Sequence, residues 1–122
     1  MDKNLKLPHD HTDTEKNRKI LEMMPSEEMI NSVADAMKQL GDPSRLRIFW
    51  LLCHTEECVI DIAAIVNMTS PAVSHHLRLL KTAGLITSRR SGKEMFYKAA
   101  DTLLAETLHH TIENIGEISC NI

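Results

Sequence analysis

The stretch that decides the fold runs from Thr69 to Lys98 and reads TSPAVSHHLRLLKTAGLITSRRSGKEMFYK. Its first half predicts a helix, because Val73, Leu77 and Leu80 recur at helical spacing and form one apolar face. His76 lies about 100° around the helix from His75, so it belongs either to the polar face or to the packing against the domain. The outward face that remains is polar and holds Ser70, Ser74, His75 and Arg78.

The second half of this stretch predicts a β-hairpin with strands over 85–89 and 94–98. Arg90-Ser91-Gly92-Lys93 forms a connection of the kind that contains glycine. The hairpin carries three basic side chains, Arg89, Arg90 and Lys93. A helix with a polar outer face followed by a basic hairpin is typical of a winged helix-turn-helix. There the helix lies in a DNA major groove and the wing rests on phosphates.

Charge is distributed unevenly along the chain. The whole protein has a formal charge of -3, yet Ser70–Lys98 contains six basic residues and one acid. This segment therefore has a charge of +5 and the remainder has -8. A single basic segment on an acidic body indicates a localised contact surface for a polyanion, whatever the overall charge.

Composition restricts the class of protein. A chain of 122 residues supports one domain of modest core size, and 3% aromatic residues favour a helical core of Leu, Ile, Val, Met and Ala. No apolar run approaches a membrane span and the N-terminus lacks a signal peptide, so we expect a cytoplasmic protein. There is no Gly-rich phosphate loop, no HExxH motif and no nucleophile–base pair, so an enzyme is not expected.

The rest of the chain is predicted to be helical outside a polar N-terminal arm. The arm covers 1–13, and one domain covers 14–122. Pro25, Gly41 and Asp42-Pro43 are the boundary signals, and Asn67 suits a left-handed turn. The fold class is therefore mostly α with a β-hairpin wing and about five to six helices. Besides the helix at 69–83, the predicted helices cover 14–24, 26–40, 43–53, 58–66 and 101–118.

Four segments in order resemble the ArsR/SmtB family of metal-sensing bacterial repressors. They read LGDPSRLRIFWLL (40–52), ECVIDIA (57–63), SHHLRLLKTAGLI (74–86) and RRSGKEMFY (89–97). The resemblance covers about 30–118. It implies a homodimer whose first and last helices form the interface, bound to an imperfect palindromic operator in double-stranded DNA. It also implies repression that is relieved by a bound ion, with no membrane and no small organic substrate involved.

The residue types on the predicted DNA surface fit this implication. Ser70 and Ser74 can donate to phosphates or base edges, and Arg78 has the side chain that most often reads guanine. His75 and His76 can reach bases or backbone. We expect the wing residues Arg89, Arg90 and Lys93 to contact phosphates, with an affinity that depends on salt.

Two ion sites are implied by the resemblance. The first joins the N-terminal arm of one subunit to the start of the helix at 58–66 of the other. Cys58 and Asp61 are three residues apart and would share a helix face. A thiolate and a carboxylate suit zinc or cadmium if two more ligands arrive, and His9 and His11 in the arm are natural donors. Ile60 replaces the second cysteine of the family's thiolate motif.

The second implied site lies across the dimer and takes ligands from the last helices of both chains. Asp101 and Glu117 match two of its four ligand positions, but Leu103 and Asn114 stand where histidines are expected. A shifted variant is possible, because acidic and imidazole side chains step by 4, 3 and 4 residues along one face. The stripe consists of Glu106, His110, Glu113 and Glu117, opposite an apolar stripe of Leu104, Leu108, Ile112 and Ile115.

Alternative readings remain open for these side chains. Cys58 also suits a buried packing residue or a redox thiol in a metal-independent repressor. Cys53, Cys58 and Cys120 together would suit an arsenite sensor. Cys53 lies on an apolar helix and is expected in the core, while the acidic stripe on the last helix equally suits a solvated face.

Overall fold

A computed structural model of the protein describes residues 7–9 and 14–118. These residues separate into two compact units, which are divided between residues 33 and 34. In the first unit, α1 (Thr14–Met23) has no buried residue and carries an Arg18–Glu15 ion pair of 2.6 Å. Helix α2 (Glu27–Gln39) begins after Pro25, and its first turn is capped by Ser26 Oγ, which accepts from the Met29 N–H at 3.1 Å. None of the helices in the described part of the chain is long and apolar enough to cross a membrane.

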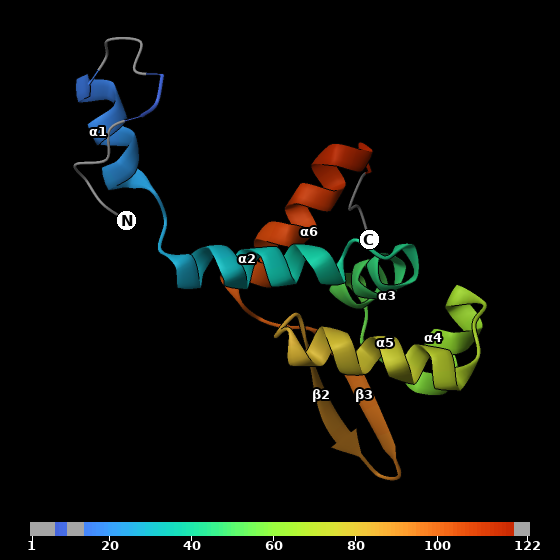
Figure 1. Ribbon diagram of the computed structural model, residues 1–122. Helices are drawn as coiled ribbons and strands as arrows, with labels where there is room; N and C mark the ends of the chain where they lie inside the picture. Colours follow the sequence, from blue (N-terminus) through green and yellow to red (C-terminus); the bar gives the residue numbers. More distant parts are fainter. Residues whose placement is uncertain (1–6, 10–13, 119–122) are drawn as a thin grey trace. The chain divides into compact units, whose positions relative to one another are not determined.

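The second unit is a winged helix-turn-helix, as the sequence predicted, with the β2–β3 hairpin extending from beside α5 (Figure 1). The end of α2 enters this unit through the buried Ala36. The other elements are α3 (Pro43–His54), β1 (Glu57–Cys58), α4 (Val59–Val66), α5 (Ser70–Thr82), β2 (Ile86–Ser91), β3 (Glu94–Ala99) and α6 (Leu103–Gly116).

The core of this unit lies where α3, α4 and α5 meet. The predicted apolar face of α5 is confirmed, because Val73, Leu77 and Leu80 are all buried. They pack in one cluster with Ile48 and Phe49 of α3, among other buried side chains. Burying this face against α3 and α4 leaves the opposite face of α5 directed outward.

Local signals in the sequence set the helix boundaries. Asp42 Oδ2 accepts from the Arg45 N–H at 2.9 Å, with Pro43 in the first turn of α3. Asn67 ends α4 with φ 55° and ψ 54°, a left-handed conformation that asparagine tolerates better than most residues. Thr69 then caps α5 by accepting from the Ala72 N–H at 3.3 Å. The Asn67 turn and the Thr69 cap thus join α4 and α5 as a helix-turn-helix.

The three strands form an antiparallel sheet in the order β1-β3-β2. In the hairpin Ser91 pairs with Glu94, and Gly92 has φ +64° at the first central turn position, where glycine is favoured.

Strand β1 was not expected from the sequence. Cys58 was predicted to begin a helix, but it pairs with Phe96 in extended conformation and stands just before α4. The predicted link at 54–57 is likewise shorter, since His54 belongs to α3. Strand β1 forms because the edge of β3 offers hydrogen-bonding groups to which the chain before α4 adds a short strand.

Candidate nucleic-acid interface and metal centre

The outer face of α5 is exposed where the sequence predicted it. Ser70, Ser74, His75 and Arg78 all lie on the surface, while Val73 and Leu77 between them are buried. Because the helix is anchored along its opposite side, its polar side chains are presented by a rigid support. This is what reading of base edges in a major groove requires.

His76 differs from its neighbour His75. Its side chain is only 15% exposed, and its Nδ1 lies 3.5 Å from Arg45 Nη1 and 4.0 Å from Asp42 Oδ2. Burial lowers the pKa of His76, and the Asp42 carboxylate only partly offsets this. The side chain therefore packs against the start of α3, which is the inward alternative that the sequence left open.

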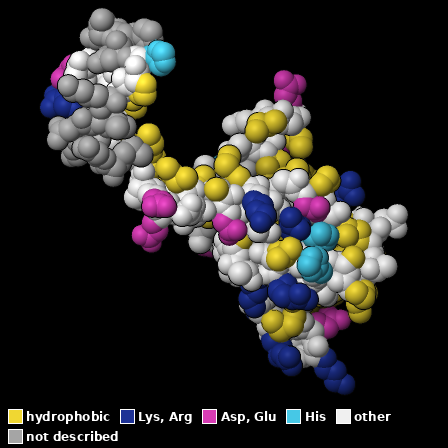
Figure 2. All heavy atoms as spheres, in the orientation of Figure 1, with side chains coloured by type: hydrophobic (Ala, Val, Ile, Leu, Met, Phe, Trp, Pro, Cys, Tyr) yellow, Lys and Arg dark blue, Asp and Glu magenta, His cyan; other side chains and the backbone are white. Residues whose placement is uncertain are grey.

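Basic side chains gather around the hairpin and beside α5, as Figure 2 shows. Arg89, Arg90 and Lys93 are all exposed. Lys81 Nζ, in the last turn of α5, donates to Ser88 Oγ of β2 at 2.7 Å. We call α5 the reading helix, because its outer face is the one predicted to lie in the major groove. The bond connects the reading helix to the hairpin wing, so the two basic elements form one surface.

One wing arginine is already engaged within the protein. Arg89 Nε and Nη2 donate to the Glu56 carboxylate at 2.6–3.0 Å, and its guanidinium lies 5.2 Å from the centre of the Phe96 ring. The hydrogen bond from Arg89 lowers the pKa of Glu56. Glu56 therefore occupies the groups through which Arg89 would contact a phosphate.

The residues of the predicted arm site differ in burial and in backbone conformation. Cys58 is 6% exposed and Asp61 lies on the surface in the first turn of α4. Because Cys58 is extended, the argument that the two share a helix face does not apply. His9 is exposed, whereas His11 and Cys120 lie outside the described residues.

The residues of the second predicted site point in different directions. His110 Nε2 lies 3.7 Å from Glu106 Oε1 on an exposed part of α6. Glu117 takes a left-handed conformation at the end of the helix, and Asp101 is exposed before its start. Glu113, expected on the same stripe, is 9% exposed and turns inward. The stripe is divided because the α6 turn that carries Glu113 faces the end of α3.

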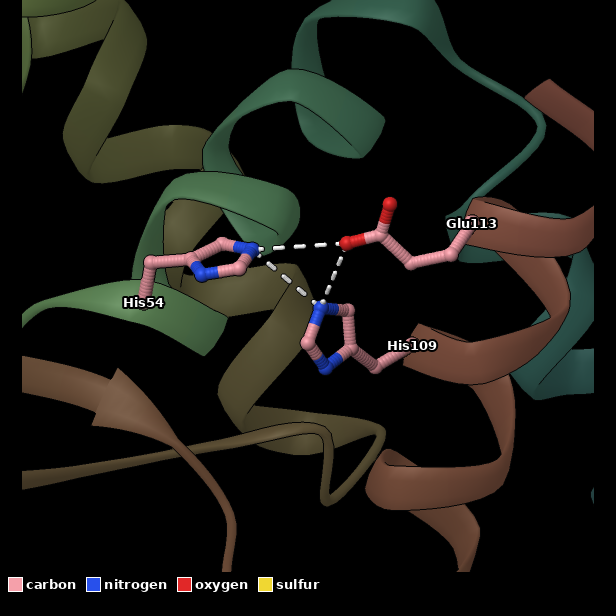
Figure 3. Close-up of side chains that lie close together, drawn as sticks. All are labelled: His54, His109 and Glu113. Carbon is pink, nitrogen blue, oxygen red and sulfur yellow. Dashed lines mark hydrogen bonds and ion pairs between the residues drawn. The ribbon is translucent and has the colours of Figure 1, made fainter. Parts of the chain in front are cut away.

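Glu113 instead contacts two histidines, His54 and His109, that belong to neither predicted site. His109 Nε2 lies 3.1 Å from Glu113 Oε1 and 3.2 Å from His54 Nε2, and His54 Nε2 lies 3.5 Å from Glu113 Oε1. Figure 3 shows His54 reaching from the end of α3 toward two residues on α6 that lie one turn apart. We call these three side chains the His54 cluster.

The His54 cluster is the one group among residues 7–9 and 14–118 whose three or more His, Cys, Asp or Glu ligand atoms lie within 4.8 Å of one another. His109 and Glu113 could have been paired from their spacing of four residues. His54 carried no such signal, because it lies 55 residues before His109 and ends an apolar helix. Cys53, beside it, is half-buried against the core.

The fold and the exposed basic surface define a winged helix-turn-helix regulator that binds DNA. A model of the family described as "bacterial regulatory protein, arsR family" matches residues 42–88. The chain is 32% identical over 93 residues to the HTH-type transcriptional repressor SmtB of Mycobacterium tuberculosis, which covers 76% of this chain and 69% of that protein. It is 40% identical over 70 residues to the cadmium resistance transcriptional regulatory protein CadC homolog of Staphylococcus aureus, covering 57% of this chain and 58% of that one.

Solved structures agree with this assignment. The homodimeric winged helix-turn-helix domain of Mb0332 from Mycobacterium bovis, a possible ArsR-family regulator, superposes with a TM-score of 0.68 at 27% identity, over 80% of this chain and 93% of that one. The repressor BigR from Xylella fastidiosa superposes with a TM-score of 0.64 at 28% identity, over 73% and 87%. The chain belongs to the ArsR family, whose members are transcriptional regulators and not enzymes.

Proposed function

We propose that this protein is a homodimeric repressor that binds an imperfect palindromic operator when free of metal and releases it on binding zinc or cadmium. The observation that carries the DNA-binding part is the joined surface of α5 and the hairpin. Four polar side chains of α5 lie outward, and the Lys81–Ser88 bond connects them to a wing with exposed basic residues. Such a surface supplies both base readout and phosphate contacts.

The second unit has an apolar surface that supports a dimer through α6. Leu104 and Ile115 of α6 and Met37 at the end of α2 are all exposed, Ile115 at 81%. Leu108 and Ile112, between them on α6, are half-buried. The winged helix-turn-helix domain of Mb0332 is homodimeric. A two-fold dimer would place its two reading helices on half-sites about 34 Å apart.

The identity of the ion is supported by relatives and by residue chemistry. One relative is a cadmium resistance regulator. Cys58 stands directly before α4, and α4 leads through the Asn67 turn into α5. An ion held by Cys58, Asp61 and the arm histidines would act on the helix before the reading helix. A coupling of about 1–3 kcal/mol per ion is enough for useful release.

The proposal is tested by operator binding with and without metal. The metal-free protein first selects a DNA duplex from a random library. The selected duplex is labelled, and its fluorescence anisotropy is followed as protein is added with no metal or with zinc, cadmium, nickel, arsenite or peroxide. We expect tight binding without metal and release by zinc or cadmium. Cys58→Ser should bind the duplex and resist release.

Three outcomes would contradict parts of the proposal. If the metal-free protein selects no DNA duplex from the library, the protein is not a DNA-binding repressor. Release by arsenite or peroxide alone would assign the cysteines to thiol sensing. Normal zinc release by Cys58→Ser would reject the arm site.

A further inference from the structure

We infer that His54, His109 and Glu113 form a binding site for a divalent transition-metal ion of the zinc class inside a single protomer. The inference rests on the proposed function for its regulatory meaning, because it names a place where the ion would bind. Binding of the ion at this site can be measured without DNA, independently of whether the ion releases the operator. Its ligands differ from both sites that the sequence suggested, except for Glu113.

The spacing of the three ligand atoms fits tetrahedral coordination. Zinc binds imidazole nitrogen and carboxylate oxygen at about 2.0–2.2 Å, so two ligands at tetrahedral positions lie about 3.3 Å apart. The three distances in the His54 cluster are 3.1, 3.2 and 3.5 Å. All three atoms therefore lie near the positions they would take around one ion.

Hydrogen bonding alone leaves one of these contacts unexplained. Each Nε2 atom carries at most one hydrogen, and Glu113 Oε1 donates none when the carboxylate is ionised. At most two of the three close contacts are then hydrogen bonds. If both histidines donate to Glu113, the 3.2 Å contact joins two donors. An ion at the centre would satisfy all three atoms at once.

The surroundings favour a cation and leave room for a fourth ligand. The side chains of the cluster are only 10–19% exposed, so a charge there is screened little by water. A cavity of about 400 Å³ reaches His54 and His109. Its wall includes the acidic side chains of Glu56, Asp101 and Glu106 and one lysine, Lys98. Water can complete the coordination from this side, as in zinc sites with three protein ligands.

An ion here would join two parts of the molecule. It would tie α6, the proposed dimer helix, to the last residue of α3. Two residues beyond His54, Glu56 holds Arg89 of the wing. The site thus lies between the surface proposed for dimerisation and the surface proposed for DNA.

The test measures metal binding without DNA, in a Cys58→Ser background that removes the arm site. Zinc titration by calorimetry and cobalt titration by visible absorption are carried out on metal-free protein. We expect one ion per protomer and the absorption of tetrahedral cobalt. His109→Gln and Glu113→Gln each remove a direct ligand and should weaken binding by at least the roughly 100-fold that loss of an outer partner can cost. His110→Gln, one residue away and exposed, should not change it.

Folding controls keep the result interpretable. Circular dichroism and urea unfolding show whether each variant is folded, and Glu113→Gln retains a hydrogen-bonding group of similar size. The inference is overturned if the Cys58→Ser protein binds neither zinc nor cobalt, or if His110→Gln loses binding as strongly as His109→Gln. If the metal binds here but DNA is not released, the site stands and the proposed function fails.

Discussion

The DNA-reading surface and the His54 cluster are built in opposite ways. The first comes from one continuous stretch, 69–98, and presents exposed side chains on a helix and a hairpin. The second joins the end of α3 to α6 across 55 residues and is largely buried. One depends on local structure and long-range charge, whereas the other depends on how the helices pack. Substitutions that affect only DNA binding, or only the packing of the helices, test this difference.

The largest effect is expected at the reading helix. Arg78 is exposed on α5, so Arg78→Ala should leave the free energy of unfolding nearly unchanged. Operator affinity should fall by about 10- to 100-fold, because a bidentate arginine–guanine contact is lost. Anisotropy titration measures the affinity, and Arg18→Ala, an exposed arginine on α1, is the matched control. Equal affinities for both variants would remove Arg78 from the DNA surface.

The wing should contribute charge and not sequence recognition. Lys93 lies in the hairpin turn, and removing one phosphate contact should reduce the slope of log affinity against log salt by about 0.9. Between 50 and 200 mM salt this corresponds to about a threefold change in affinity. Titrations of Lys93→Ala at several salt concentrations measure it, with Lys19→Ala as control. A loss of affinity with an unchanged slope would contradict a phosphate contact.

Features that depend on residues close together in the sequence could be predicted, and features that depend on distant partners could not. The Asp42 cap, the left-handed Asn67 and the apolar face of α5 depend on residues within a few positions of each other, and all were found. The extended conformation of Cys58 depends on pairing with Phe96, which is distant in the chain. The inward turn of Glu113 likewise depends on the position of His54. Periodicity along one helix carries no information about such partners.

His76 lies between the two kinds of region, because it belongs to α5 but packs inward. Burial lowers its pKa in the folded state below the ordinary value of 6.5, so the unfolded chain binds more protons as the pH falls through this range. The stability that the neutral side chain contributes is therefore present above pH 6.5 and is lost below it. Urea unfolding is measured at several pH values between about 7.5 and 5, the range in which histidine ordinarily titrates. As the pH falls, the free energy of unfolding should decline less steeply for His76→Gln than for the wild type. His110→Gln, exposed on α6, should keep the wild-type decline; identical curves for all three proteins would place His76 in solvent.

The smallest effect is expected where the two regions meet. Glu56 borders the cavity beside His54 and also holds the guanidinium of Arg89, so it competes with any phosphate for that side chain. Glu56→Gln removes the carboxylate charge and keeps the shape. Because the ion pair is exposed and screened, we expect operator affinity to rise by only about twofold, with a steeper salt dependence. If adding Arg89→Ala to Glu56→Gln removes this gain in affinity, Arg89 contacts DNA only when it is not bound to Glu56. An unchanged affinity in Glu56→Gln would instead mean that the pair persists in the complex, and the wing would then bind through Arg90 and Lys93 alone.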